Sequence, residues 1–518
     1  MEIGAVVAVV SAALKHGHGL VELCQDLKHA RAQIEERIVE VQSHWRRSAM
    51  QLEFTRRVHA SLGEEHQQHQ VAIITILDGK LKAASHKIQR LVKKRRRADL
   101  ELDQKLRVKR WKYVFVKPFL DSLIYDLAKW QRMFDPSWYL IMRIADPSID
   151  QCLKIEDDAT RPEVRRLLKT AKQIRSAILP ATAEESGIFL PSDGMNGISP
   201  INIPYSAAVW LQRHSSGTSS TFVVDTIPCP QDQYVGLTTQ DIRRLASKLR
   251  CVDPSAFGVL KCHGVVKMLA NNSRLTSFAM VFLTPSPAIP CTLRQLLQAP
   301  AAHSLSDRIS LAKRLATSIN YVHTLDFVHK NVRPENFLNF LDSPQSDLGS
   351  CYLIGFEQIR SADGKTYLRG DDAWEKNIYR HPERQGPFPQ EAYNMQHDIY
   401  SLGVCLLEVG VWSSFVLHGE DGPVQGTGQA LGLGLDELKR KLVRRPASIK
   451  DHLVALAKRE LPRLIGNIYT SVVVTCLTCL DDDNEDFGEC EDHEDADGVF
   501  VGVKYIEQVL LKLDDITL

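Results

Sequence analysis

The chain has 518 residues, of which 44% are hydrophobic and 25% are charged, and its formal net charge is +1. This length exceeds what one ordinary hydrophobic core can organise, so two or three domains are expected. The small net charge argues against a dedicated nucleic-acid-binding protein. The 11 cysteines are odd in number and scattered, which indicates reduced thiols in the cytoplasm and predicts neither a disulfide framework nor a metal site.

Residues 1–184 are predicted to form an all-α helical bundle. No proline occurs between Met1 and Lys117, so several long helices can form. Apolar residues recur at spacings of three and four, as in the stripe Ile34, Ile38, Val41 and Trp45. Gly17 and Gly19 predict an interruption of the first helix. The expected architecture is a bundle of about four or more helices.

The N-terminal stretch MEIGAVVAVVSAAL is apolar and short. No segment is expected to reach the roughly 18 to 20 apolar residues that span a bilayer. No basic residue precedes the apolar stretch, so it is a poor signal peptide. It could pack in the bundle core or insert shallowly into a membrane interface, and core packing is the preferred interpretation.

A basic run, KKRRR, lies at positions 93–97 and consists of Lys93, Lys94, Arg95, Arg96 and Arg97. It is a candidate contact for anionic lipid headgroups, each charge contributing about 1 kcal/mol. A solvated helix face and a nuclear-import signal remain open as alternatives.

The composition changes at residues 185–204, where Gly, Pro, Ser and Asn dominate, and this stretch is predicted to be the inter-domain linker. Beyond it, short apolar runs such as TFVVDTI precede longer helical stripes. Strands followed by helices predict an α+β domain over residues 205–518. Its small sheet lobe is expected at about 205–290 and its larger helical lobe at about 291–518.

The stretch FVHKNVRPENFL, residues 327–338, resembles the protein-kinase catalytic loop, whose pattern is H-R-D-L-x-x-x-N. His329, Lys330 and Asn331 stand at the H-R-D places, and Arg333 and Asn336 follow in register.

Three further landmarks come in the order that the family shows. These are Gly355, Phe356 and Glu357 at the D-F-G place, His381, Pro382 and Glu383 at the A-P-E place, and Asp398 near the start of the large lobe's central helix. The resemblance predicts a bilobal protein-kinase-like fold in which His329, Phe356 and Asp398 are scaffold residues.

Three groups that kinase chemistry needs are absent from their expected places. Kinases use an aspartate as base, a second aspartate for magnesium and a strand lysine for the phosphates. Here the base position is Asn331, the metal position is Gly355, and no lysine occurs between Lys172 and Lys248. The chain is therefore predicted to be a pseudokinase without catalytic residues, and neither ATP nor magnesium is an expected cofactor. The alternative is a weak, atypical kinase that uses Asn336, Glu357 and a displaced lysine such as Lys261.

Four hydroxyl residues lie where an activation loop would be and are candidate phosphate acceptors: Ser361, Thr366, Tyr367 and Tyr379. The sequence does not distinguish among them.

The start of the chain, MEIGAVVAVVSAALKHGHGLVELCQDL, resembles the fungal HeLo and HeLo-like cell-death domains. The whole layout is similar to that of the mixed-lineage-kinase-like executioner of necroptosis. The resemblance implies a cytoplasmic signalling protein, recruited to membranes, whose pseudokinase regulates a membrane-active helical domain. It also implies a protein partner and a homo-oligomer formed through the helical domain. A plain interaction scaffold without membrane activity stays open as the second alternative.

Overall fold

A computed structural model gives two compact units, residues 1–175 and residues 176–518. The structure describes residues 3–25, 32–59, 64–98, 105–144, 171–172, 175, 187–191, 199–215, 218–229, 235–270, 275–341, 348–358, 360–361, 371–387, 389, 392–419, 422–487 and 499–516.

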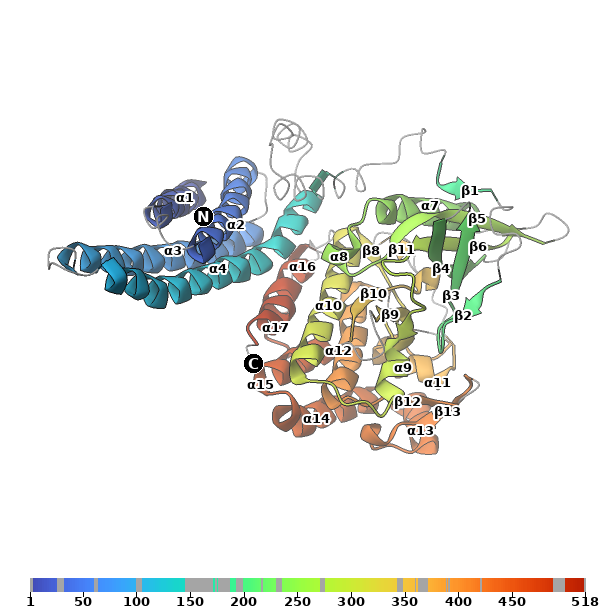
Figure 1. Cartoon of the computed structure of the whole chain (residues 1–518). Coiled ribbons are helices and arrows are strands. Elements are labelled where there is room, and N and C mark those ends of the chain that lie inside the picture. Colours follow the sequence, from blue (N-terminus) through green and yellow to red (C-terminus); the bar gives the residue numbers. More distant parts are fainter. Residues whose placement is uncertain are drawn as a thin grey trace. The chain divides into compact units, whose positions relative to one another are not determined.

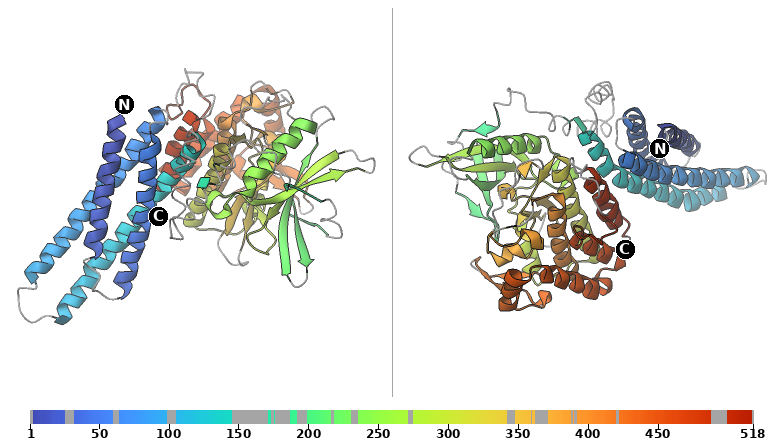
Figure 2. Two further views of the ribbon diagram at one scale, coloured as in Figure 1. Left: turned by 90° about the horizontal axis from the view of Figure 1, so that it is seen from above. Right: turned by 180° about the vertical axis from the view of Figure 1, so that it is seen from behind.

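The described residues of the first unit form four long helices, in agreement with the predicted helical bundle (Figures 1 and 2). They are α1 (Ile3–Gln25), α2 (Ala32–Val58), α3 (Glu64–Ala98) and α4 (Lys105–Ile144). Helix α1 contacts α2 and α3, and α4 also contacts both α2 and α3. Polar ties join α4 to its neighbours: Arg47 of α2 lies 2.5 Å from Asp135, and Lys80 of α3 lies 2.6 Å from Asp126.

The predicted apolar stripe of α2 lies in the bundle core, with Ile34, Ile38, Val41 and Trp45 all buried. The predicted interruption at Gly17 and Gly19 is wrong, because α1 continues through both residues to Gln25. The physical reason lies across the helix interface. A Cβ atom on Gly17 would stand 2.0 Å from the Trp45 ring, so the missing side chain lets α2 pack closely against α1.

Helix α1 also corrects the expectation that no segment is apolar enough to span a bilayer. Its stretch Val6–Gln25 has 20 residues and a mean hydropathy of 1.2, which meets the length and composition of a membrane span. About a third of this stretch, 33%, is buried within the protein, including Val10 and Ala13. Length and composition alone do not separate a membrane helix from a core helix.

The second unit begins with a six-stranded sheet in the order β1-β5-β6-β4-β3-β2 (Figure 1). All neighbouring strands are antiparallel except β1 and β5. The strands are β1 (Phe189–Leu190), β2 (Ile201–Asn202), β3 (Val209–Ser215), β4 (Thr218–Pro228), β5 (Lys261–Leu269) and β6 (Leu275–Leu283). Helices α7 (Val235–Arg250) and α8 (Pro254–Phe257) separate β4 from β5. The stretch predicted as linker thus contributes β1 and β2 to this sheet.

The larger lobe is mainly helical, so an all-α bundle followed by a bilobal α+β domain is the observed fold class. Its helices are α9 (Leu293–Gln298), α10 (Leu305–Thr324), α11 (Trp374–Asn377), α12 (Met395–Val411), α13 (Leu435–Arg444), α14 (Ala447–Leu464), α15 (Asn467–Leu477), α16 (Val499–Tyr505) and α17 (Lys512–Asp514). Its short strands are β7 (Cys291–Thr292), β8 (Phe327–Val328), β9 (Phe337–Phe340), β10 (Ser350–Leu353), β11 (Arg360–Ser361), β12 (Val416–His418) and β13 (Val424–Thr427). Helix α12 is buried along nearly its whole length and forms the centre of the lobe.

The Gly17 contact leads to a prediction with an internal control. Alanine favours a helix over glycine by about 1 kcal/mol, so Gly19→Ala, with open space around it, should strengthen hydrogen-exchange protection of α1. Gly17→Ala should weaken this protection because its methyl group collides with Trp45. Equal protection in the two variants of the full-length chain would contradict the close helix contact.

Candidate functional site

The loop between β8 and β9 is fixed by one buried carboxylate, Asp398 at the start of α12. Asp398 accepts hydrogen bonds from the backbone N–H groups of His329, at 2.7 Å, and Lys330, at 2.9 Å. The Tyr393 hydroxyl donates a third at 2.6 Å, and the His323 ring lies 3.1 Å away. Burial raises the pKa of Asp398, but the hydrogen bond from His323 and the other neighbours outweigh it and hold the pKa below its usual value. The ionised carboxylate can therefore hold Lys330 at its left-handed φ of 63°.

His329 connects this loop to the segment after β10. Its Nε2 lies 3.0 Å from the carbonyl oxygen of Ile354, and its Nδ1 accepts a hydrogen bond from the backbone N–H of Asn331 at 3.3 Å. The two contacts require a neutral ring with the proton on Nε2. Burial agrees with this state, because it lowers the pKa of His329 to about 4. The ring also lies against Phe356, with 5.1 Å between ring centres.

The side-chain amide of Asn331 is engaged at both ends. Its Nδ2 donates to Oε1 of Glu357 at 2.8 Å, and its Oδ1 accepts from Nε of Arg333 at 2.8 Å. Only an amide can make both contacts, since a carboxylate at this position would face Glu357 with a second negative charge. Asn331 is thus an internal link between the loop and the Gly355 segment.

Gly355 is the residue that the sequence resemblance places where kinases have a metal-binding aspartate. Its φ is +84°, and a Cβ atom there would lie 2.3 to 2.6 Å from the side-chain atoms of Asn336. An aspartate would meet both backbone strain and a steric clash in this conformation. Asn336 is the residue that matches the magnesium-binding asparagine of the kinase pattern. Its Nδ2 donates a hydrogen bond to the backbone carbonyl oxygen of Asn331 at 2.6 Å.

Asp225 is a site residue that the sequence analysis missed. It lies on β4, the strand before helix α7, and its Oδ2 accepts hydrogen bonds from the backbone amides of Gly355, at 3.1 Å, and Phe356, at 2.9 Å. Burial raises the pKa of Asp225 to about 6; the charge of Glu357 adds to this, and the Phe356 amide opposes it. In a kinase the strand before this helix carries the lysine that binds phosphates. Here that strand presents a carboxylate.

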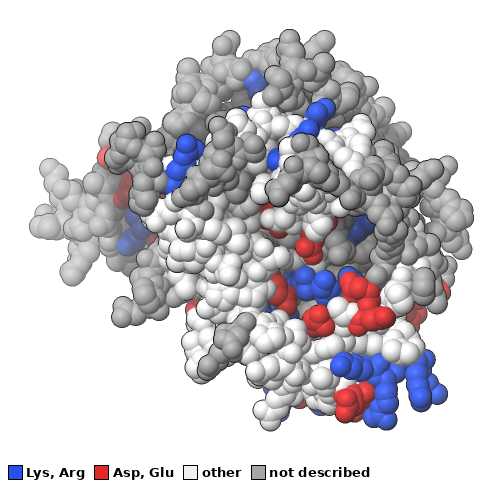
Figure 3. Space-filling model, turned by 90° about the vertical axis from the view of Figure 1, so that its right-hand side faces the viewer, with Lys and Arg blue, Asp and Glu red and all other residues white. Residues whose placement is uncertain are grey.

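A pocket of about 160 Å³ opens beside these residues. Its lining holds one guanidinium, that of Arg333, and four carboxylic acids: Asp225, Glu335, Glu357 and Glu375. The other lining residues are Tyr205, Ser206, Ala207, Ala208, Asn336, Ile354, Gly355, His418 and Val424. Figure 3 shows acidic side chains gathered beside a few basic ones on one face of the protein. The pocket is smaller than the roughly 300 to 1,000 Å³ typical of small-molecule sites, and its charge opposes a polyphosphate.

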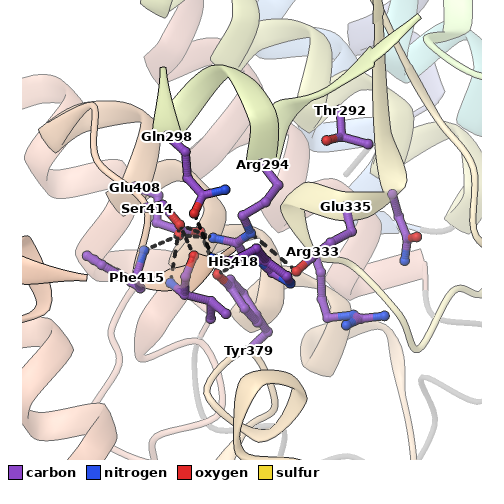
Figure 4. Close-up of polar contacts among 12 residues, drawn as sticks. Thr292, Arg294, Gln298, Arg333, Glu335, Tyr379, Glu408, Ser414, Phe415 and His418 are labelled. Carbon is purple, nitrogen blue, oxygen red and sulfur yellow. Dashed lines mark hydrogen bonds and ion pairs between the residues drawn. The ribbon is translucent and has the colours of Figure 1, made fainter. Parts of the chain in front are cut away.

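Behind the pocket, Arg294 of α9 joins four segments through a fully buried guanidinium (Figure 4). It lies 3.2 Å from Glu335 of the loop, 2.7 Å from Glu408 of α12 and 2.5 Å from the hydroxyl of Tyr379. The Tyr379 hydroxyl donates to the second oxygen of Glu408 at 2.8 Å. Burial raises the pKa of Glu408, whereas the charges of Arg294 and Arg333 hold that of Glu335 down against the effect of burial.

Tyr379 therefore lies in this buried network, with 1% of its surface exposed, and its proposed role as a phosphate acceptor is wrong. Ser361 is on β11, and Thr366 and Tyr367 lie outside the described residues. Lys261, the displaced lysine of the alternative hypothesis, begins β5 and does not line the pocket.

The other predicted site residues are not among those that line the pocket. Pro382 and Glu383 belong to a single 3-10 turn, Pro382–Arg384, with His381 immediately before it. The basic run, Lys93 to Arg97, belongs to helix α3, but its side chains lie outside the described residues.

No protein-family model matches this chain, and no curated protein matches its sequence. Among solved structures, it is similar to a chain of the CAK complex from Chaetomium thermophilum bound to ATP-γ-S. The identity is 16% and the TM-score 0.35, and the match covers 54% of this chain and 83% of that chain.

Asp225 leads to a pH prediction. The pKa of this carboxyl group is about 6 in the folded protein, against 3.8 for an unperturbed aspartate. Between these two pH values the folded state therefore binds a proton that the unfolded state has released. Its contribution to stability is then fully present below about pH 4 and is lost as the pH rises through about 6. The neutral amide of Asp225→Asn does not titrate, so the variant should not show this loss. Its free energy of unfolding relative to that of wild type should therefore rise by about 3 kcal/mol between pH 4 and pH 8.

Urea unfolding of the second unit across this pH range checks the prediction. Asp482→Asn, which removes an exposed carboxylate, is the matched control. A difference between Asp225→Asn and wild type that does not change with pH would contradict the burial of a titrating carboxyl group.

Proposed function

We propose that the chain is a non-catalytic signalling protein in which a pseudokinase unit regulates the N-terminal helical unit. The observation that carries the proposal is the position of Asp225. Its carboxylate binds the Gly355 and Phe356 amides from the strand on which a kinase would hold its phosphate-binding lysine. A phosphate placed there would meet negative charge where catalysis requires positive charge.

The remaining groups support the same conclusion. The amide of Asn331 cannot accept the proton of a substrate hydroxyl, and it is already bonded to Glu357 and Arg333. Gly355 offers no metal ligand, and its surroundings leave no room for one. Base, metal ligand and phosphate clamp are thus replaced together by contacts that hold the domain in one conformation.

The rival function, a weak kinase, has support from Asn336 and Glu357, which both line the pocket and both have oxygen atoms that could bind magnesium. These two residues would have to release their present hydrogen bonds with the Asn331 backbone and side chain. We consider this rearrangement unfavourable, because it also leaves the carboxylate of Asp225 facing the phosphates.

Restoring the base alone provides a direct test. Asn331→Asp should not produce phosphoryl transfer from γ-labelled ATP to the chain or to a generic substrate. It should also lower the free energy of unfolding by about 1 to 3 kcal/mol, because two carboxylates then face each other at a partly buried site. Asn467→Asp, at the exposed start of α15, is the matched control and should have little effect on stability. Transfer by Asn331→Asp, or by wild type, would overturn the proposal.

For the helical unit we propose a HeLo-like role in cell-death signalling at membranes, with oligomers formed through this unit and a protein partner that acts on the pseudokinase. Two features support it. Helix α1 contains a 20-residue apolar stretch, and α3 ends in the basic run. Apolar insertion and attraction to anionic headgroups are the two contributions that hold a peripheral protein on a membrane.

Sedimentation of the full chain with phosphatidylserine vesicles tests the membrane role. Replacing Lys93 to Arg97 by glutamine should lower binding at least 10-fold, because each charge contributes about 1 kcal/mol near an anionic surface. The control replaces five basic residues of α13 and its end by glutamine: Lys439, Arg440, Lys441, Arg444 and Arg445. If both variants bind like wild type, the chain is a scaffold without this membrane contact.

A further inference from the structure

A second group of polar side chains lies apart from the pocket, where the turn Pro382–Arg384 meets the start of α12. It consists of His381, Glu383 and His397, and each offers one ligand atom within 4.8 Å of the other two. The two histidines are buried, with 5% and 2% of their surfaces exposed, whereas Glu383 is exposed. This arrangement has two imidazoles in the interior and a carboxylate at the surface.

The histidines have unused ligand atoms. Among the described residues, Nε2 of His381 and Nε2 of His397 have no hydrogen-bond partner, and Nδ1 of His381 has only the Glu383 carboxylate beside it, without hydrogen-bond geometry. Leaving a buried donor or acceptor unsatisfied costs about 1 to 3 kcal/mol, so two such nitrogens in one place require an explanation. A bound ion supplies one, because it would satisfy a lone pair on each ring.

The ring of His397 is oriented by the contact that metal-bound histidines usually make. Its Nδ1 lies 2.7 Å from Oδ1 of Asn394, the residue that caps α12. The Asn394 backbone N–H lies 3.1 Å from the same nitrogen, so the ring can carry its proton on either nitrogen. Metal binding would select the tautomer in which Nδ1–H donates to Oδ1 of Asn394, because this leaves the Nε2 lone pair for the ion.

We propose that His381, Glu383 and His397 bind one divalent transition-metal ion of the zinc class. Two nitrogens and one carboxylate oxygen are a common zinc ligand set, whereas calcium and magnesium prefer oxygen alone. Metal–ligand distances of about 2.0 to 2.2 Å place tetrahedral ligands about 3.5 Å apart. Nδ1 of His381 and Oε2 of Glu383 are already 3.3 Å apart. The other separations are at most 4.8 Å, so binding requires the ligand atoms to approach one another further.

Two basic residues near the cluster limit its affinity. Lys450 and Arg384 each act on one of the histidine rings through their charge. Lys450 is paired with Asp481, and the Arg384 guanidinium lies 5.5 Å from the centre of the Tyr393 ring. The ion would join the turn Pro382–Arg384 to the start of α12. It would thereby fix the turn, and residues 371–380 before it, to the central helix of the large lobe.

The test uses the full-length chain, freed of metal by a chelator and titrated with Zn²⁺ in a calorimeter and with Co²⁺ in a spectrophotometer. We expect one equivalent bound and a cobalt spectrum of nitrogen and oxygen ligands, without the charge-transfer band of thiolates. Glu383→Gln should weaken binding at least 10-fold and leave the fold intact, since this side chain is 47% exposed.

Glu437→Gln is the matched control, because its side chain is also 47% exposed and lies on α13. It should bind metal like wild type. Absence of one-equivalent binding, a thiolate-type cobalt spectrum, or equal affinity in the two glutamine variants would overturn the proposed site.

Discussion

The arrangement of the second unit depends on the hydrogen bonds that the Asp398 carboxylate accepts from the loop at His329 and Lys330. This carboxylate is buried on the central helix and binds the loop backbone at two consecutive residues. From that fixed loop, His329 reaches the Ile354 carbonyl, and Asn331 reaches Glu357. The geometry of the pocket is therefore transmitted from α12, through the loop, to the segment that follows β10.

The same segment is held from its other side by the small lobe. Asp225 of β4 accepts hydrogen bonds from the backbone amides of Gly355 and Phe356. The segment after β10 is thus bound by the strand on one side and by the loop on the other. In an active kinase the residues at the corresponding positions bind the metal and the phosphates of the nucleotide. Here the protein's own groups satisfy one another, which removes the need for a ligand to order the site.

Much of this site could be predicted from the sequence, because its motifs are contiguous. The stretch FVHKNVRPENFL places His329, Asn331 and Asn336 by spacing alone, and the absence of a lysine before Lys248 is visible by inspection. Asp225 was missed because its role depends on a contact with a residue 130 positions away. A lone acid within the apolar run TFVVDTI was the available signal. Gly17 was misjudged because local propensity favours a break, whereas packing of Trp45 favours a continuous helix.

The central claim is that this pocket does not accept a nucleotide, and direct binding calorimetry with ATP and magnesium tests it most simply. We predict no saturable heat at millimolar nucleotide, because Asp225, Glu357 and the closed Asn331 network oppose a polyphosphate at the same place. Saturable binding of one equivalent that disappears in Asn336→Ala would contradict the account, since it would show that the loop opens and holds a magnesium nucleotide.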